Sequence, residues 1–194
     1  MDLRTLRQEI QELPSLEKNV QSFLQHWARP LRYSSNKLPS LTKTNTLLRK
    51  ELHKKVAETE EYLAAIKMGQ HLQEKLHSYI HSLIELKLTT FNGNKQKSAM
   101  ILRHFLQDEV FNLKQTLLEQ EQLEQAVQGL RKQYLHVNGI VQKHLSLEDG
   151  IVFSEAPHLM QLQNIIAVVE KQKKLLKQLG EHFVLLAKET RGKK

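Results

Sequence analysis

Histidine is the residue type that most invites a chemical role in this chain, because the sequence contains ten of them. His77 and His81 are one helical turn apart, and Glu74 precedes His77 by three residues, as in the Glu-x-x-His half of a carboxylate-bridged di-iron site. Such a site needs a second pair of this kind and further carboxylates that converge from other helices. One pair in a stretch rich in Glu and His is expected by chance, so we predict no metal site and no cofactor.

The sequence also lacks the motifs of other enzymatic chemistry. It has no cysteine, which excludes disulfides and thiolate-bound zinc, and it has no Gly-x-Ser-x-Gly nucleophile motif. Neither a Gly-x-x-x-x-Gly-Lys loop nor a Gly-x-Gly-x-x-Gly turn is present to bind phosphates. We therefore predict that the protein is not an enzyme and has no small-molecule substrate.

Positive charge is concentrated in one part of the chain. The net charge is +8, and residues 18–55 hold nine basic side chains against the single acid Glu51, which equals the whole excess. Arg49, Lys50 and Lys54 lie in the helix-forming part of this segment, and they are spaced so that they can share part of one helix surface. The predicted partner- or anion-binding residues are Arg29, Arg32, Tyr33, Lys37, Arg49, Lys50 and Lys54, with Trp27 and Tyr33 as stacking or anchoring aromatic residues.

Three interpretations of this basic segment stay open. An acidic surface on another protein would complement it. The phosphates of a nucleic acid or of an anionic membrane would complement it equally well. The third interpretation is a solvated helix face beside a charged loop, which is the commonest role of a run of charges.

The elements that would position these residues are helices. Apolar residues recur at spacings of three and four over residues 44–88, 96–137 and 157–188, which indicates long helices that pack side by side at shallow angles. Asn92 and Gly93 form a short connection, so the second helix should run antiparallel to the first. The predicted apolar stripe of the third helix consists of Leu159, Leu162, Ile166, Val169, Leu176, Phe183 and Ala187.

The predicted fold class is all-α: an elongated, coiled-coil-like antiparallel bundle of three long helices with two short N-terminal helices. Residues 1–43 would hold the short helices and a connector, and residues 44–190 the bundle. Pro14 should end the first short helix, and Ser15 should cap the second. The first helix is amphipathic and could enter a membrane, but its three acidic residues favour docking onto the bundle.

Glycines and polar residues interrupt the predicted apolar stripes. The glycines inside long helices are Gly69, Gly129 and Gly180. They mark either close helix crossings or tolerated surface positions. The glutamines at positions where the first two stripes lose their apolar residues are Gln70, Gln73, Gln120 and Gln122. They form either a buried polar layer that sets the helix register or a solvent-facing group.

Composition and pattern together indicate a soluble interaction protein. The sequence has no signal-peptide-like apolar run and no stretch of about 18 uncharged apolar residues, so we expect an intracellular, cytoplasmic protein. We predict a non-enzymatic scaffold, subunit or adaptor that binds another protein, or a second copy of itself, through helix faces and the basic N-terminal region. The alternative is a bundle that binds nucleic acid or an anionic membrane surface through residues 29–55.

Overall fold

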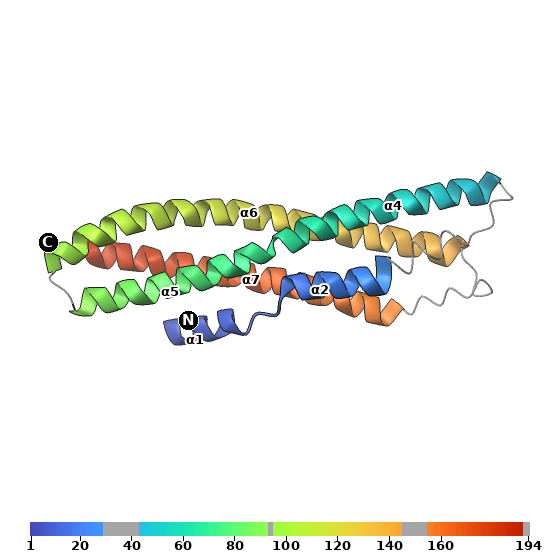
Figure 1. Ribbon diagram of the computed structural model, residues 1–194. Helices are drawn as coiled ribbons and strands as arrows, with labels where there is room; N and C mark the ends of the chain where they lie inside the picture. Colours follow the sequence, from blue (N-terminus) through green and yellow to red (C-terminus); the bar gives the residue numbers. More distant parts are fainter. Residues whose placement is uncertain (29–42, 93–94, 145–154, 192–194) are drawn as a thin grey trace. The chain divides into compact units, whose positions relative to one another are not determined.

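The computed structural model describes residues 1–28, 43–92, 95–144 and 155–191, and side chains within 1–27, 46–88, 112–140 and 159–189. Its elements are α1 (Leu3–Gln11), α2 (Leu16–Phe23), the π-helical turn η1 (Leu24–Ala28), α4 (Lys43–Met68), α5 (Gln70–Asn92), α6 (Lys95–His144) and α7 (Glu155–Arg191) (Figure 1). No strand occurs in these ranges, which confirms the all-α fold class. None of the described helices is both long and apolar enough to cross a membrane.

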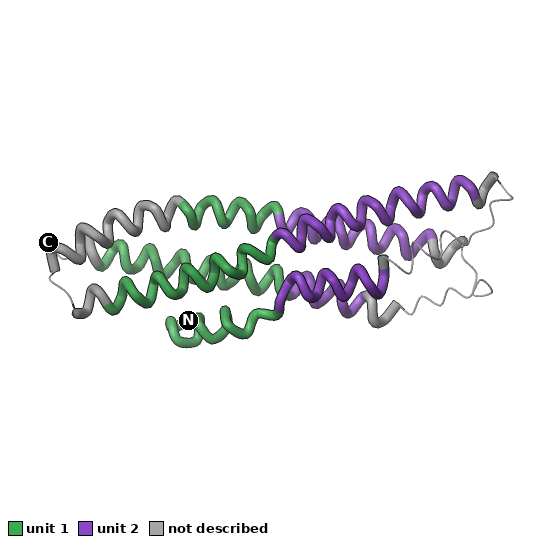
Figure 2. The backbone as a smooth tube through the Cα atoms, in the orientation of Figure 1, with its two compact units in different colours: residues 1–14, 69–122, 168–194 green, residues 15–68, 123–167 purple. Residues whose placement is uncertain are grey.

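The chain forms two compact units, each built from segments that are distant in sequence (Figure 2). Unit 1 comprises residues 1–14, 69–122 and 168–194, and it includes α1, α5 and parts of α6 and α7. Unit 2 comprises residues 15–68 and 123–167, and it includes α2, η1, α4 and the remaining parts of α6 and α7. The division into 1–43 and 44–190 stays a prediction.

Unit 1 is held together by one apolar cluster to which all its helices contribute. Lys75 Nζ lies 3.1 Å from Glu119 Oε2, and Tyr79 Oη lies 2.8 Å from Thr116 Oγ1. Residue numbers therefore rise along α5 as they fall along α6, which confirms the antiparallel arrangement for this pair. The buried members of the cluster are Leu6, Ile10, Leu76, Tyr79, Ile80, Leu83, Leu86, Leu113, Leu175, Leu176, Leu179, Phe183 and Leu186.

An aromatic cluster of Phe23, Trp27 and Tyr134 lies in the core of unit 2. Trp27 has no exposed surface, and its ring centroid lies 5.3 Å from that of Phe23 and 5.2 Å from that of Tyr134. The indole Nε1 donates to Asn138 Oδ1 at 3.4 Å. The prediction that Trp27 is a stacking or anchoring residue for a partner is therefore wrong, because its side chain is fully buried. Its position follows from the apolar stripe of α2 and η1, which places Trp27 one turn after Phe23.

The predicted helix over 44–88 is divided at Gly69. α4 ends at Met68 and α5 begins at Gln70, and the amide of Leu72 donates to the Gly69 carbonyl three residues earlier at 3.0 Å. Glycine is a poor helix former, and here it stands at the point where the regular hydrogen-bond ladder is interrupted. In contrast, α6 continues through Asn138 and Gly139 to His144, beyond the predicted end at residue 137. α7 begins at Glu155 and carries Pro157 in its first turn, where proline is tolerated.

The buried face of α7 differs from the predicted stripe. Leu162, Val169, Leu176 and Phe183 are buried as predicted, but Leu159 is 41% exposed. The stripe missed the buried residues Ile165, Val168, Leu175, Leu179 and Leu186. The physical reason is a buried glutamine, Gln172, in the middle of this face. Because the prediction considered only apolar residues, it left out Gln172, and the predicted stripe was displaced toward one side of the buried face.

The predicted polar layer exists in part, and it lies in unit 1. Gln120 and Gln172 are each 1% exposed: Gln172 Nε2 donates to Gln120 Oε1 at 2.9 Å, and Gln120 Nε2 donates to the Val169 carbonyl at 3.1 Å. Gln73 is also buried, but it donates to the Pro14 carbonyl at 3.0 Å rather than to another glutamine. Gln122 faces solvent, and Gln70 is half-buried. Hydrogen bonding offsets part of the cost of burying these amides, and Gln172 Oε1 has no partner in the described residues.

Substitutions of Gln172 should show that the buried amides act as a pair. We expect Gln172→Leu to lower the free energy of unfolding by about 1–3 kcal/mol, because Gln120 Oε1 is left buried without a donor. Gln120→Leu with Gln172→Leu should be near neutral, because both partners are removed together with the unpartnered Gln172 Oε1. Urea unfolding of the two single variants and the double variant measures this coupling. Additive losses would show that the amides do not depend on each other.

Two glycines of α6 in unit 2 provide a matched pair for testing the predicted close crossing. A Cβ on Gly129 would lie 2.6 Å from Cζ of Tyr62 on α4, whereas a Cβ on Gly139 would meet nothing within 4 Å. We expect Gly139→Ala to raise the free energy of unfolding by about 0.5–1 kcal/mol, because alanine is the better helix former. Gly129→Ala should lose this gain and fall about 1–2 kcal/mol below Gly139→Ala, because the Tyr62 ring must move.

The cause of this difference is testable by removing the tyrosine ring. In a Tyr62→Ala background, Gly129→Ala should again be stabilising when both variants are compared by urea unfolding. If Gly129→Ala stabilises the chain with Tyr62 in place, the crossing is looser than the structure indicates.

Candidate functional site

Three of the predicted site residues lie in the described part of the chain, and all three are on α4 in unit 2. Lys50 and Lys54 are exposed, and Arg49 is half-buried with its Nε atom enclosed and without a hydrogen-bond partner in the described residues. The others, Arg29, Arg32, Tyr33 and Lys37, lie outside the described residues, as does the connector 30–43 up to the start of α4. The structure thus brings Arg49, Lys50 and Lys54 into one stretch of helix.

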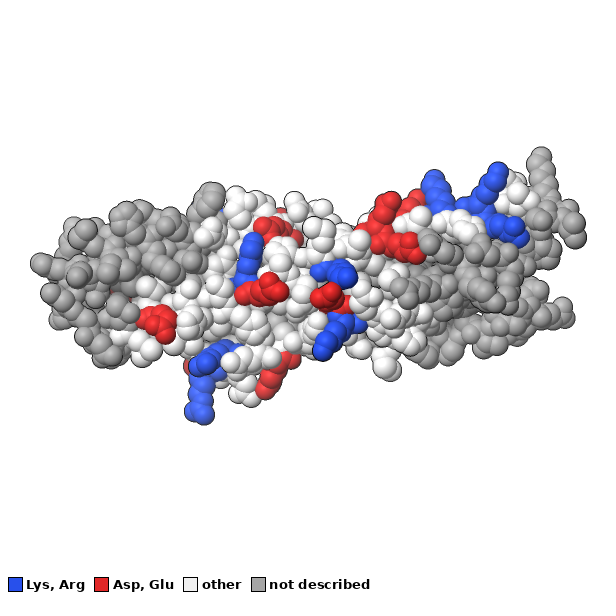
Figure 3. All heavy atoms as spheres, in the orientation of Figure 1, with Lys and Arg blue, Asp and Glu red and all other residues white. Residues whose placement is uncertain are grey.

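Charge along α4 changes sign with position. Lys and Arg side chains gather near the N-terminal end of the helix, and Glu side chains lie beside them along it (Figure 3). Lys50 and Lys54 form no ion pair with any residue that the structure describes, whereas Lys55 Nζ lies 3.2 Å from Glu58 Oε2. Lys54 also lowers the pKa of the Glu58 carboxyl through its charge, but both lysines are exposed to solvent and can be reached by a partner.

Glu58 is held in its charged form by its neighbours. Hydrogen bonding from Lys55 lowers the pKa of the Glu58 carboxyl, and a further hydrogen bond from the Gln133 amide on α6 acts in the same direction. Close by, His136 Nε2 of α6 lies 3.7 Å from Glu51 Oε1. These contacts tie the acids of α4 to groups within unit 2.

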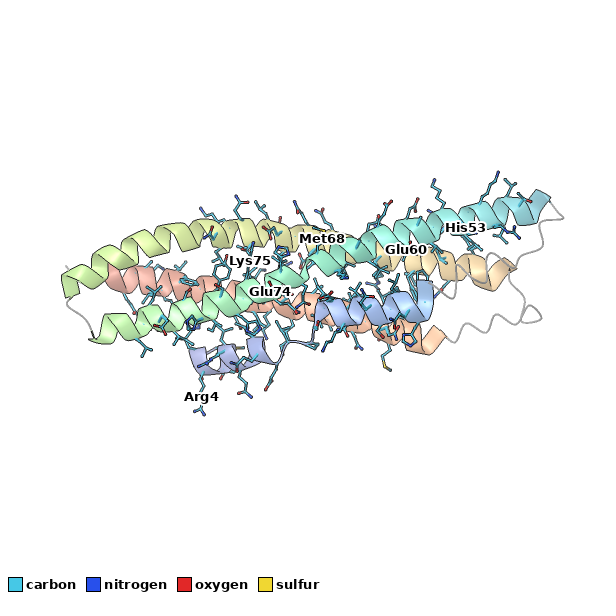
Figure 4. The ribbon with its side chains drawn as sticks, viewed as in Figure 1. Arg4, His53, Glu60, Met68, Glu74 and Lys75 are labelled. Carbon is cyan, nitrogen blue, oxygen red and sulfur yellow. The ribbon has the colours of Figure 1, made fainter. Side chains whose placement is uncertain are left out.

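The predicted residues form part of a longer solvent-facing surface, which sequence reasoning did not identify. At spacings of three and four, α4 exposes Leu47, Lys50, Lys54, Ala57, Glu61, Ala64 and Met68, and we call this set the α4 outer face. Leu47 is 58% exposed, and Met68, labelled in Figure 4, is 74% exposed. The sequence does contain a second, weaker apolar stripe on the side of α4 opposite the buried one. Counting charges alone did not identify it.

A second candidate is a shallow hollow of about 320 Å³ between α5 and α6 in unit 1, lined by Lys75, Ser78, Tyr79, Asn112 and Gln115. Its strongest polar groups already have partners within the protein, because Lys75 is paired with Glu119 and the Tyr79 hydroxyl with Thr116. The hollow therefore offers few free groups with which to recognise a ligand.

Metal ligands do not converge in the described part of the chain. Glu74, His77 and His81 are all exposed on α5, and no group of three or more ligating side chains that could hold a metal ion occurs in the described residues. The premise that Glu74 and His77 are a single pair is wrong, because Glu155 and His158 form a second Glu-x-x-His in the sequence. Its side chains lie outside the described residues, and it belongs to unit 2, whereas Glu74 belongs to unit 1.

Neither a protein-family model, nor the sequence of a characterised protein, nor a solved structure matches this chain. The functional proposals below therefore depend on the surfaces of the molecule itself.

The ion pairs of Glu119 should make part of the stability of unit 1 depend on pH. Hydrogen bonding from His71 at 2.6 Å, and then from Lys75, lowers the pKa of the Glu119 carboxyl below its ordinary value of 4.5. Because the folded pKa is depressed, the stabilisation is fully present above pH 4.5 and is lost as the pH falls through the folded pKa.

We expect Glu119→Gln to remove this contribution, which is at most about 1 kcal/mol because the pairs are exposed to solvent. Urea unfolding at pH 7 and pH 3 should give a smaller difference between the two pH values for the variant than for the wild-type chain. Glu121→Gln, exposed on the same helix and without an ion pair in the described residues, is the control. Equal pH dependence in all three proteins would show that Glu119 contributes nothing.

Proposed function

We propose that this chain is a non-enzymatic helical scaffold that binds a partner protein on the α4 outer face. The observation that carries the proposal is the composition of this face: the exposed apolar residues Leu47, Ala57, Ala64 and Met68 share it with Lys50 and Lys54, which form no ion pair with any described residue. Interfaces combine apolar contact area with charges that steer and orient the partner.

The core of unit 2 supports this interpretation because it does not need the α4 outer face. Leu48, Leu52, Val56, Leu63 and Ile66 already bury the opposite side of α4, and each is at most 9% exposed. The exposed side chains of Leu47 and Met68 therefore lie outside this buried face. Alanines at positions 57 and 64 leave room for a second helix to approach α4 closely. The partner that fits is a helix with apolar residues along its contact face and acidic residues opposite Lys50 and Lys54.

A second candidate function is binding of phosphates on a nucleic acid or an anionic membrane. The observation that favours it is the cluster of Arg49, Lys50 and Lys54, in which neither lysine has an ion-pair partner in the described residues and the Arg49 Nε has no hydrogen-bond partner there. Binding of this kind depends on charge alone and weakens steeply with salt. The two functions therefore differ in one testable way: binding of a partner protein needs the exposed apolar residues of the α4 outer face, and binding of phosphates does not.

Substitution of the apolar ends of the α4 outer face should separate the two functions. We expect Leu47→Asp with Met68→Asp to reduce recovery of the partner protein at least tenfold, because two exposed apolar contacts are replaced by charges. Folding should change by less than about 0.5 kcal/mol, because both side chains are exposed. The measurement is quantitative mass spectrometry of proteins recovered from the source cell with the wild-type and variant chains.

The experiment has two controls. Leu118→Asp, on α6 in unit 1 and 53% exposed, should recover the same partners as the wild-type chain. Lys50→Glu with Lys54→Glu should weaken protein binding moderately but abolish binding to nucleic acid or anionic vesicles. Sedimentation of each variant shows whether the partner is a second copy of the chain. Identical recovery by the wild-type chain and the Leu47→Asp, Met68→Asp variant would rule out the α4 outer face as the binding surface.

A further inference from the structure

The α4 outer face has the residue spacing of a seam that a second helix can cover. Its members follow one another at alternating spacings of three and four residues, without a break from Leu47 to Met68. This is the periodicity that a coiled-coil partner covers. The opposite side of α4 has a similar periodicity from Leu48 to Ile66, and it is buried in unit 2. α4 therefore carries two seams, of which one is covered by the described residues and the other is exposed.

Charge along α4 separates into a basic half and an acidic half. Residues 46–56 hold four Lys or Arg side chains against one Glu, and residues 57–68 hold three Glu side chains against one Lys. Figure 3 shows the two signs gathered over separate stretches of this helix. On the outer face, Lys50 and Lys54 lie before Ala57, and Glu61 lies after it. The face is therefore complementary in charge to a reversed copy of itself.

The charged members of this face are not paired within α4. The residues three and four positions from Glu61 are three alanines and Glu58, so its own helix supplies no cation at those spacings. Lys50 likewise has no acid three or four residues away. Glu58, four residues after Lys54, accepts a hydrogen bond from Lys55 at 3.2 Å instead. Glu61 forms no ion pair with any residue that the structure describes, so another molecule would have to supply its cation.

Reversal of the helix about Ala57 brings opposite charges to the same level. At about 1.5 Å of rise per residue, Lys54 lies about 4.5 Å before Ala57 along the helix, and Glu61 lies about 6 Å after it. In an antiparallel pair with Ala57 on the two-fold axis, Lys54 therefore lies beside Glu61 of the second copy, and Leu47 lies beside Met68. Two-fold symmetry makes each of these contacts twice. The small side chain of alanine at the axis lets the two helices approach closely.

Other alignments of two α4 helices bring like charges together. A parallel pair in register would set Lys50 and Lys54 against their own copies. An antiparallel pair shifted by one heptad would place either Lys54 or Glu61 on the two-fold axis, where each would meet itself. Contact between like charges is unfavourable, so the charge pattern selects the antiparallel alignment about Ala57.

We propose that the partner bound by the α4 outer face is a second copy of this chain, and that the two α4 helices pair antiparallel about Ala57. Lys54 of each copy pairs with Glu61 of the other, and Leu47 packs against Met68 of the other at both ends of the contact. This inference rests on the proposed protein-binding role of the face, and it adds the identity of the partner and the alignment. A different protein on the same face would leave the proposed function intact and contradict the inference.

Charge reversal tests the pairing in solution. Sedimentation velocity of the full chain over a range of concentrations measures dimerisation, and far-ultraviolet circular dichroism checks the folding of each variant. We expect the wild-type chain to dimerise, and Lys54→Glu and Glu61→Lys each to weaken the dimer about tenfold, because two ion pairs become like-charge contacts. An equimolar mixture of the two variants should recover the wild-type affinity to within about threefold, since the introduced Glu then faces the introduced Lys.

Cysteine substitution tests the direction of the two helices. The chain has no cysteine, so Ala57→Cys places a single thiol on the proposed axis, and Ala64→Cys is the matched control. Two thiols at position 57 come within disulfide distance, whereas those at position 64 lie about 21 Å apart. We expect oxidised glutathione to link the Ala57→Cys chain about tenfold faster than the Ala64→Cys chain. Equal rates, or faster linkage of Ala64→Cys, would overturn the alignment.

Failure of this inference is distinguishable from failure of the proposed function. The inference is wrong if the wild-type chain stays monomeric, if neither charge reversal weakens the dimer, or if the mixture of variants does not recover it. A monomeric chain whose Leu47→Asp, Met68→Asp variant still loses a different protein from the source cell would keep the proposed function and reject only the second copy. If that variant recovers the same proteins and also dimerises as the wild-type chain does, both are wrong.

Discussion

Burial of an apolar stripe on every helix is the constraint on which both units depend. The two short N-terminal helices show this most clearly, because neither is long enough to be stable alone. Leu6 and Ile10 of α1 are fully buried in unit 1, and Phe23 of α2 and Trp27 of η1 are fully buried in unit 2. Since burial of one large apolar side chain contributes about 1.5–3 kcal/mol, a few such residues are enough to order a segment of this length. The short helices are therefore part of the cores, and each unit is closed by its own piece of the N-terminal segment.

Polar residues within the apolar stripes restrict how the helices pair. Gln120 and Gln172 satisfy each other only at one relative position of α6 and α7, whereas leucines would tolerate other registers. Thr116 is 1% exposed, and its hydroxyl donates to the Asn112 carbonyl while it lies 2.8 Å from the Tyr79 hydroxyl. These groups are buried with hydrogen bonds, so they add specificity at small cost in stability. The same glutamines explain why the apolar pattern alone describes the cores incompletely.

The sequence predicts the helices well because their apolar periodicity is strong, and it predicts less where that periodicity is interrupted. The leucine, isoleucine, valine and tyrosine residues that recur at spacings of three and four from Leu48 to Leu86 are buried, yet the pattern does not show that Gly69 divides the helix. On α7, the buried Gln172 shifted the predicted face, so Leu159 was placed inside and Ile165 was missed. For the site, the count of charges identified Arg49, Lys50 and Lys54. It could not identify the exposed apolar residues beside them, because these carry no charge. Leu47 and Met68 are recognisable as surface residues only once the buried face of α4 is known.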